Sequence, residues 1–410
     1  MKTMDYAKEW QKIDSLMRKK RNRSALKNAA KVYDYALGSK DYAQAIKAIT
    51  CRIVNQAALG ETGQTMFDSL QQDVKRMPQP AKSVVYAIIA DAYRKYHTNN
   101  WRQIRLRTRV AVTDGDIETW DITRLFEEAL KYYRLSIQDE NILQQTSLDD
   151  YGEIADYTLD TTLHRIVLPT LYDFLVFNAI EAFKSELSHF LPRHIFVLDK
   201  PEYFADVNTF VDYKIEMPDS LRLIRYNAAG TLIEDKIEAP DSPSAEYIVI
   251  NLYRELLKFR LQDSGNKAAL ISLDVERLRY VYDNGKHADN DAMYENVLKS
   301  QMDACGQSDE WTYPALALAI LYEKQGHEGG ENSKLRYRYK ESYGLCKKIF
   351  SLCDGKDEMK AIVEMTKILW ERIAEPFVDI TFQQLQYPDS PILALVKYKN
   401  IDKLHLKIYG

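Results

Sequence analysis

Apolar residues recur at intervals of three and four along most of this chain, the spacing that places them on one face of an α-helix. The first set is Tyr6, Trp10, Ile13 and Met17. A basic stretch at 19–23 interrupts the pattern before it resumes. The opening of the chain is therefore predicted to be a short amphipathic helix that ends in a polar turn.

Pairs of such helices follow. A turn at 38–41 separates two apolar sets, and Pro78-Gln79-Pro80 separates the next pair, predicted at 64–77 and 81–96. The sets around the first turn are Leu26, Ala29, Val32, Tyr33 and Ala36 before it, and Tyr42, Ala45, Ile46, Ile49 and Ile53 after it. One hairpin of about 35 residues cannot bury both its faces, so neighbouring hairpins must stack. The pattern predicts a mainly α, tetratricopeptide-like helical-hairpin array, an α-α superhelix with a concave surface.

The helical pattern continues through most of the remaining chain. Asp121 stands at a favoured N-cap position, and Pro169 stands at the favoured first position of another helix. Further helices are predicted at 121–137, 169–187, 244–261, 267–282, 309–325, 332–352 and 356–373.

Two segments carry strand patterns instead. Within 195–239, strands are predicted at 210–215, 221–226 and 232–237, with a turn at 227–230 between the last two. At the end of the chain, 403–409 alternates polar and apolar residues, which is typical of a half-buried strand. Such a strand needs partners that this sequence does not supply, so we expect the chain to be the front part of a longer protein.

These patterns predict four regions. An N-terminal helical-hairpin array occupies 1–194, and a β-hairpin-like insert or long connection occupies 195–243. A C-terminal helical array follows at 244–388. The last region, 389–410, is interpreted as a linker and the terminal strand.

Composition agrees with an ordered helical protein. Hydrophobic residues make up 46% and charged residues 28%, while Gly (15) and Pro (12) are scarce. The net charge of -4 gives no global attraction to nucleic acid or to an anionic membrane. The 28 Tyr residues, against 13 Phe, indicate either half-exposed packing between helices or a groove lined for a ligand.

The sequence predicts no membrane span, because no run approaches about 18 apolar residues. Residues 1–5 lack the apolar core of a signal peptide, so an export signal would have to have been removed. The four cysteines, Cys51, Cys305, Cys346 and Cys353, fit no C-x-x-C spacing.

One candidate partner surface stands out. It consists of Trp101, Arg102, Arg105, Arg107 and Arg109, whose alternating arginines would lie along one face if the segment were extended. Acidic residues follow at once, namely Asp114, Asp116, Glu118 and Asp121. The alternative is therefore an internal face of salt bridges.

No segment predicts catalysis, a metal site or a cofactor site. Cys305 is followed by Gln307 rather than by a glutamine at the third position, so it does not match a thioester motif. The polar stretch 283–291, which contains His287 and Asp289, fails the spacing of a calcium loop. The stretch 327–331 lacks a second histidine, so we interpret it as a turn.

Four stretches together resemble one protein family. They are 101–108; 119–122 with 132–136; the sequence Pro-Thr-Leu-Tyr-Asp-Phe-Leu at 169–175, which is the most specific; and 398–401 with 404–409. The chain is similar to the N-terminal helical region of bacterial alpha-2-macroglobulin-like proteins. Leu168 departs from the arginine that often precedes the proline in that family.

The resemblance implies that the strand at 403–409 is the first strand of a truncated β-sandwich, macroglobulin-like domain. It also implies a non-catalytic scaffold or docking module in a protease-trapping protein of the periplasm or cell envelope. The implied partners are proteins, namely the protein's own downstream macroglobulin domains, a protease or an envelope protein. The alternative is a free-standing tetratricopeptide-like cell-surface protein that binds peptide or glycan through Tyr and Trp side chains.

Overall fold

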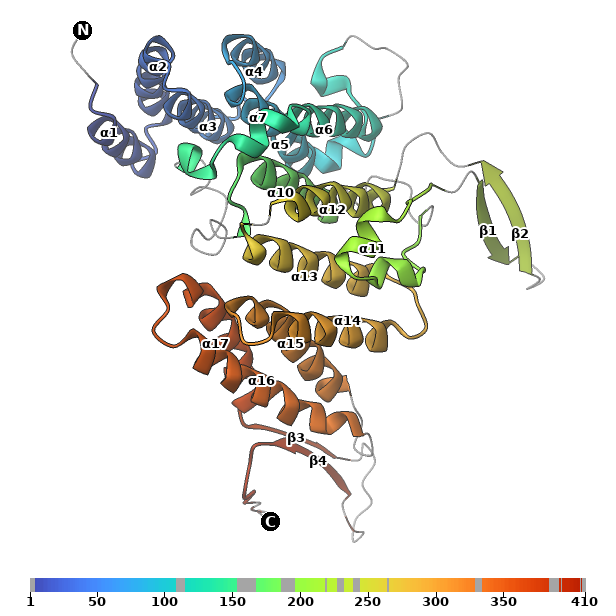
Figure 1. Cartoon of the computed structure of the whole chain (residues 1–410). Coiled ribbons are helices and arrows are strands. Elements are labelled where there is room, and N and C mark those ends of the chain that lie inside the picture. The colour runs from blue at the N-terminus through green and yellow to red at the C-terminus, as the bar shows by residue number, and fades with distance from the viewer. Residues whose placement is uncertain are drawn as a thin grey trace. The chain divides into compact units, whose positions relative to one another are not determined.

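The computed structural model describes residues 4–107, 115–152, 167–185, 196–217, 220–226, 232–238, 244–263, 265–328, 334–382, 391, 393–405 and 407. The chain divides into two compact units, Met1–Asn290 and Asp291–Gly410. Both are mainly helical (Figure 1), which confirms the predicted fold class of a helical-hairpin array with small β elements. This division, at 290, differs from each of the predicted boundaries.

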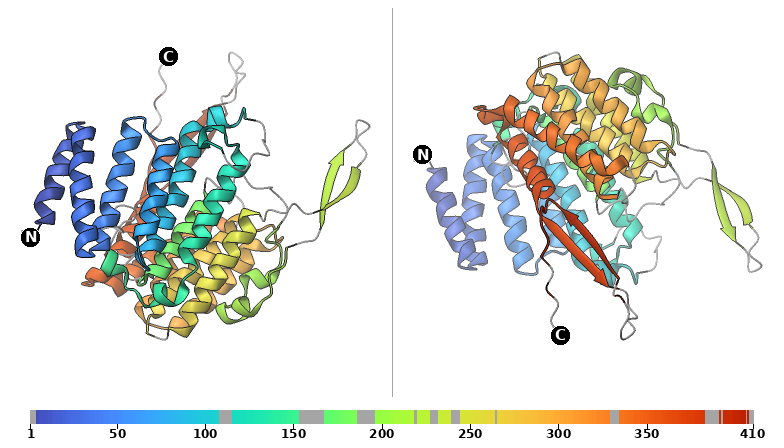
Figure 2. Two further views of the ribbon diagram at one scale, coloured as in Figure 1. Left: turned by 90° about the horizontal axis from the view of Figure 1, so that it is seen from above. Right: turned by 90° about the horizontal axis from the view of Figure 1, so that it is seen from below.

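The first unit is built from consecutive packed helices, many of them antiparallel pairs that lie side by side (Figure 2). Small residues such as Ala25, Ala36 and Ala45 are fully buried, which lets the backbones of α2 and α3 approach closely. The helices are α1 (Tyr6–Arg18), α2 (Asn22–Ser39), α3 (Tyr42–Ala58), α4 (Gln64–Arg76), α5 (Ala81–Ile104), α6 (Ile122–Ile137), α7 (Glu140–Gln145), α10 (Leu171–Lys184), α11 (Val207–Asp212), α12 (Ala245–Gln262) and α13 (Lys267–Asn284).

Tyrosines link these helices through their hydroxyl groups. Tyr33 of α2 donates a 2.6 Å hydrogen bond to Asp73 of α4, and Tyr133 of α6 donates a 2.7 Å bond to Asp91 of α5. Both rings are buried. These two tyrosines pack between helices, as one interpretation of the tyrosine excess expected, but they are buried rather than half-exposed.

The insert contains one element that the sequence pattern misassigned. The strand predicted at 210–215 is wrong, because 207–212 forms the helix α11, capped by the Asp206 side chain. The hairpin prediction is confirmed, since β1 (Ser220–Tyr226) pairs antiparallel with β2 (Leu232–Glu238). The predicted turn at 227–230 lies outside the described residues.

A buried arginine fixes the first half of the insert against the helices. Arg277 of α13 is fully buried and pairs with Asp274 one turn earlier at 2.7 Å. Its guanidinium also donates to the backbone carbonyls of Tyr203 (2.5 Å) and Ala205 (3.0 Å) and lies over the Phe210 ring. The segment that contains η4 (Pro201–Phe204) and α11 is thereby part of the first unit.

A second buried arginine explains the Pro-Thr-Leu-Tyr-Asp-Phe-Leu stretch. Thr170 and Asp173 form a capping box at the start of α10. The Asp173 carboxylate also pairs at 2.9 Å with Arg260 of α12, and both side chains are almost fully buried. Burial raises the pKa of Asp173 even though Arg260 acts in the opposite direction. The most specific part of the resemblance is therefore a structural joint between α10 and α12.

The second unit contains α14 (Asn290–Cys305), which begins at the boundary, α15 (Thr312–Glu328), α16 (Arg338–Cys353) and α17 (Lys360–Ala374). The α15 and α16 helices approach closely. A Cβ atom at Gly326 would lie only 2.8 Å from the Tyr339 ring, and Ser342 donates a 2.7 Å bond to the buried Ala319 carbonyl.

One carboxylate joins three helices of this unit. Glu295 of α14 accepts hydrogen bonds from Lys299 (2.6 Å), from Tyr322 of α15 (2.9 Å) and from Arg338 of α16 (2.8 Å). Burial disfavours its charged form, but these three donors outweigh that effect and lower the pKa of Glu295.

The β structure of the second unit is displaced from its predicted position. β3 (Phe377–Phe382), within the range assigned to a helical array, pairs antiparallel with β4 (Ala394–Lys399). The strand predicted at 403–409 is wrong for 403–405 and 407, which lie in no strand, and the remaining residues are outside the described part. Alternation of polar and apolar residues indicates which residues can form a strand. Hydrogen bonding to a neighbouring strand decides which of them do so.

Candidate docking surface

The β3–β4 ribbon has two unlike faces. The register pairs Val378 with Tyr398, Ile380 with Val396 and Phe382 with Ala394, and side chains of alternate residues share a face. All six of these side chains are apolar, and they define what we term the apolar ribbon face. The opposite face is mixed and carries Phe377, Asp379, Thr381, Leu395, Lys397 and Lys399.

The apolar ribbon face is largely open. Val378 is 41% exposed, Phe382 55% and Tyr398 68%. Ile380 and Val396, at the centre, are half-buried. Scattered apolar residues are ordinary on a protein surface, but a whole face of them on paired strands marks an interaction site or an aggregation hazard.

Polar contacts hold one end of the ribbon against the helices. Lys399, on the mixed face, donates a 2.8 Å hydrogen bond to the Arg372 carbonyl, and its ammonium lies over the Tyr339 ring. Asn400 donates a 2.7 Å bond to the Ile373 carbonyl. The strands are thus fixed through polar groups at the end of β4, and none of these contacts uses the apolar ribbon face.

Neither strand has a second neighbour among the described residues, so the ribbon has two open edges (Figure 2). Two-stranded ribbons are at best marginally stable alone, and open edges present unpaired backbone donors and acceptors. The ribbon therefore offers both an apolar face and hydrogen-bonding edges to another sheet.

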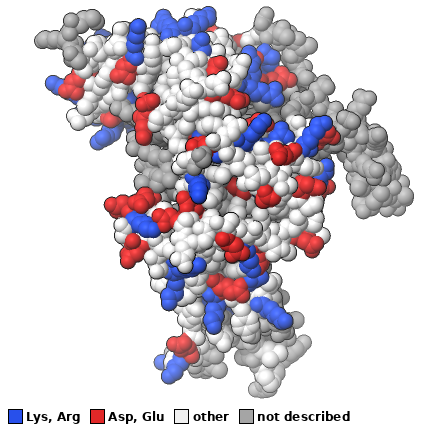
Figure 3. Space-filling view, viewed as in Figure 1, with Lys and Arg blue, Asp and Glu red and all other residues white. Residues whose placement is uncertain are grey.

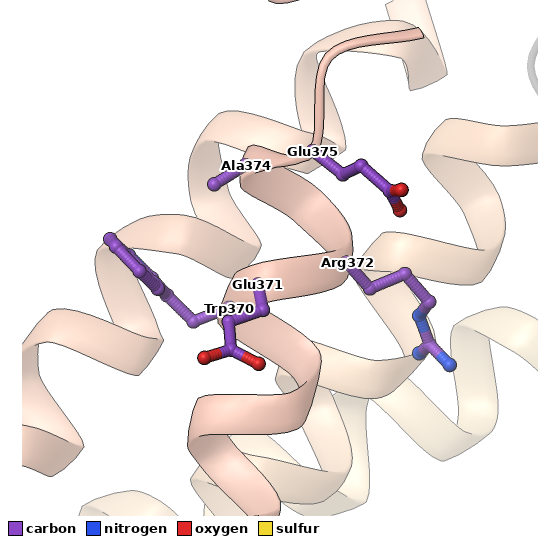
Figure 4. Close-up of a pocket in the computed structure, with 5 residues that line it drawn as sticks. All are labelled: Trp370, Glu371, Arg372, Ala374 and Glu375. Carbon is purple, nitrogen blue, oxygen red and sulfur yellow. The ribbon is translucent and has the colours of Figure 1, made fainter.

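The preceding helix adds further exposed apolar surface in the same unit. Met365 and Ile368 of α17 are 43% and 65% exposed. A hollow of about 560 Å³ lies near the end of α17. Trp370 and Arg372 project from opposite sides of the helix (Figure 4), and Arg372 is bound to Glu323.

The arginine surface predicted from the sequence does not form as an extended row. Trp101 lies in the last turns of α5 and is 44% exposed, with the guanidinium groups of Arg102 and Arg105 beside its ring. Arg107 instead donates to the carbonyls of Ile117 and Trp120. Arg102 and Arg105 thus gather at the Trp101 ring, whereas Arg107 lies beyond the end of α5. Arg109 lies outside the described residues.

The alternative face of salt bridges does not form either among the described residues. The Asp116 side chain accepts from the backbone of Glu118, and the Asp121 side chain accepts from the backbone of Arg124. Asp114 lies outside the described part. Asp116 and Asp121 cap helices instead.

Reactive chemistry is equally sparse in the described part of the chain. There, no three His, Cys, Asp or Glu side chains come together in a group able to hold a metal. Burial raises the pKa of the Cys51 and Cys346 thiols to about 11, which keeps both protonated and weakly nucleophilic. The backbone NH of Asp289 donates to the His287 ring, and Cys305 ends α14 before the turn at Gly306.

Comparisons with known protein families, with curated proteins and with solved structures found no match. Within the described residues, no helix is both long and apolar enough to cross a membrane. Acidic and basic side chains are interspersed on the face in Figure 3, with no broad patch of one sign. The apolar ribbon face is the strongest candidate site that the geometry offers.

Proposed function

We propose that the chain is a non-catalytic helical docking module whose working surface is the apolar ribbon face. We further propose that it docks a macroglobulin-type β-sandwich domain in an alpha-2-macroglobulin-like protease-trapping protein of the periplasm or cell envelope. The observation that carries the docking role is the row of six apolar side chains on one face of β3 and β4, of which four are exposed and two are half-buried. The family context rests on the sequence resemblance.

A second β-sheet fits this face physically. Sheets pack face to face about 10 Å apart with alternate side chains interdigitating, and the ribbon supplies such alternation. Burial of an exposed valine or phenylalanine contributes roughly 1.5–3 kcal/mol, so even part of the face could fix a partner. The open edges could add backbone hydrogen bonds in the same complex.

The absence of a catalytic role is part of the proposal. Its support comes from the contacts of the candidate groups: Cys51 is buried with a raised pKa, and Arg107 is engaged by backbone carbonyls. Neither group is placed next to a base or a nucleophile in these contacts.

Face-specific photocrosslinking in the native cell tests this proposal. A photoreactive residue is placed at Val378 or Tyr398 on the apolar ribbon face and, as the matched control, at Thr381 or Lys397 on the mixed face. The expected result is crosslinks from the first pair to strands of a macroglobulin-type β-sandwich, with at least fivefold lower yield from the controls.

Equal yields from the two faces would contradict docking through the apolar ribbon face. Crosslinks from that face to a protein of another type would contradict the macroglobulin context and leave the docking role in place.

A further inference from the structure

A second site lies in the first unit, in the groove that α10 and α13 form over α12. A cavity of about 530 Å³ opens there. Both α10 and α13 pack on α12, which places α12 beneath the groove; the three helices are drawn in green to gold in Figure 1. The lining residues are Phe177, Glu181 and Lys184 from α10, and Glu276, Arg279, Tyr280, Asp283 and Asn284 from α13.

Tyr253 of α12 lies next to Tyr280 of the cavity lining and has an unsatisfied hydroxyl group. The side chain is fully buried, and its hydroxyl has no hydrogen-bond partner among the described residues. Burial raises its pKa well above the ordinary value, and the charges of Glu276 and Glu181 act in the same direction. These two residues, with Tyr280 and Arg279, are its electrostatic neighbours, and all four line the cavity. The hydroxyl therefore lies close to charged groups that line the groove.

The charges on the walls are unevenly paired. Lys184 binds Glu181 at 2.7 Å, and Arg279 lies 3.7 Å from Asp283. Glu276 has no ion-pair or hydrogen-bond partner among the described residues, although it is only half-exposed. Three acids and two bases leave the lining with one net negative charge, and that charge resides on Glu276.

Aromatic rings complete the site. Tyr280 is 6% exposed, and its ring packs against that of Tyr253 with centroids 6.0 Å apart. Phe177 contributes an aromatic ring from the α10 side. A carboxylate without a partner, aromatic rings and an unpaired hydroxyl are the groups that together recognise an organic cation.

We propose that this groove binds a primary alkylammonium group. The ammonium pairs with Glu276 and donates a hydrogen bond to the Tyr253 hydroxyl oxygen, while the alkyl chain lies against Tyr280 and Phe177. Both a lysine side chain of a peptide and a free diamine carry this chemistry. The site lies in the first unit and the ribbon in the second, so this inference does not depend on the proposed docking function.

Calorimetry with two probes distinguishes the two sources. Cadaverine represents a free diamine, and Nα-acetyl-lysine N-methylamide represents a peptide lysine. We expect at least one to bind the 410-residue chain with millimolar or better affinity, and glutarate, a matched dianion, to bind at least tenfold more weakly. Binding of the lysine amide alone indicates a peptide, and tighter binding of cadaverine indicates a free amine.

Two variants test the assigned groups. Glu276→Gln should lower the affinity for the bound probe at least tenfold, and Tyr253→Phe should lower it about threefold. Because the Tyr253 hydroxyl is unpaired without ligand, Tyr253→Phe should leave the unfolding midpoint unchanged or raised, which separates lost binding from lost structure. The control Glu371→Gln, in the second unit, should leave the affinity unchanged.

Several results would overturn the inference. They are no binding of either amine by the unaltered chain, equal affinity for glutarate, or full affinity in folded Glu276→Gln protein. A lower midpoint in Tyr253→Phe would contradict the unpaired hydroxyl.

Discussion

The α12–α13 layer buries charged groups, whereas the β3–β4 ribbon exposes apolar ones. In the helical layer, Arg260 and Arg277 are completely buried and paired with Asp173 and Asp274. In the ribbon, six apolar side chains share a face that is mostly exposed. Buried charges are costly unless paired, and exposed apolar surface is costly until covered.

The difference separates structural groups from functional ones. Both buried arginines pair with aspartates of the chain, and the guanidinium group of each lies over a neighbouring ring. Two backbone carbonyls also accept hydrogen bonds from Arg277. The apolar ribbon face obtains no comparable partner from the described residues. A group that folding has satisfied explains stability, whereas a surface that folding leaves uncovered indicates a partner.

The largest expected effect on stability is in the α12–α13 layer. Arg277→Leu removes one member of a buried pair and leaves the Asp274 carboxylate and two carbonyls without their donor. We expect a loss of about 4 kcal/mol in the free energy of unfolding, measured by urea denaturation. The control Arg279→Leu, two residues along α13 and half-exposed, should cost under about 0.5 kcal/mol. Equal costs would show that the buried arginine is not a structural anchor.

A somewhat smaller effect is expected at the α10–α12 joint. Asp173→Asn keeps the size of the side chain but leaves Arg260 charged in a buried site, with Asp263 as its remaining carboxylate. The expected loss is about 3 kcal/mol by the same measurement. Asp263→Asn, at the more exposed partner, should cost about 1 kcal/mol or less. The reverse order would mean that the exposed carboxylate, not the buried one, holds the arginine.

A pH-dependent effect is expected at Glu295 in the second unit. Its pKa is lowered in the folded state, so its contribution to stability is fully present above the unfolded pKa of about 4.5 and is lost as the pH falls through the folded value. Glu295→Gln should flatten the decline in unfolding free energy below about pH 4.5, measured by denaturation at several pH values. Glu341→Gln, at the more exposed partner of Arg338, is the control. An unaltered pH profile in Glu295→Gln would contradict this assignment.

The smallest effect on stability, and the largest effect on docking, is expected at the apolar ribbon face. Replacement of Val378, Ile380 and Val396 by threonine keeps β-branched side chains in the strands while making the apolar ribbon face polar. We expect the unfolding free energy to change by under about 1 kcal/mol and the crosslinking of the docked partner to fall at least tenfold. A matched Thr381→Val change on the mixed face should preserve crosslinking. Persistent crosslinking in the threonine variant would exclude the face as the docking surface.

Local sequence signals predicted much of the helical fold. The Asp121 cap and the apolar spacing placed α6 to within a residue, and α12 and α13 were predicted nearly as closely. The strand predicted at 210–215 failed because the cap at Asp206 and the packing of Phe210 beneath Arg277 favour a helix there. That arginine lies more than sixty residues away in the sequence, so no local pattern could indicate the contact.

The candidate site was largely missed, although its signal was present. The sequence Phe-Val-Asp-Ile-Thr-Phe at 377–382 alternates and is rich in β-branched and aromatic residues, which is typical of a strand. Because this segment follows closely after the predicted helix at 356–373, it was assigned to the helical region and the strand was not predicted. The apolar ribbon face could not be foreseen, because it depends on the register between β3 and β4.

Amide hydrogen exchange in β3 and β4 tests the central claim most directly. It is measured on the purified 410-residue chain and on the same chain isolated with its partner from native cells. We expect rapid exchange in the outward-facing amides of Phe377–Phe382 and Ala394–Lys399 in the purified chain. In the complex we expect at least tenfold slower exchange of these amides, with exchange in α5 unchanged. Equal exchange in both samples would contradict the claim that the ribbon is the docking surface.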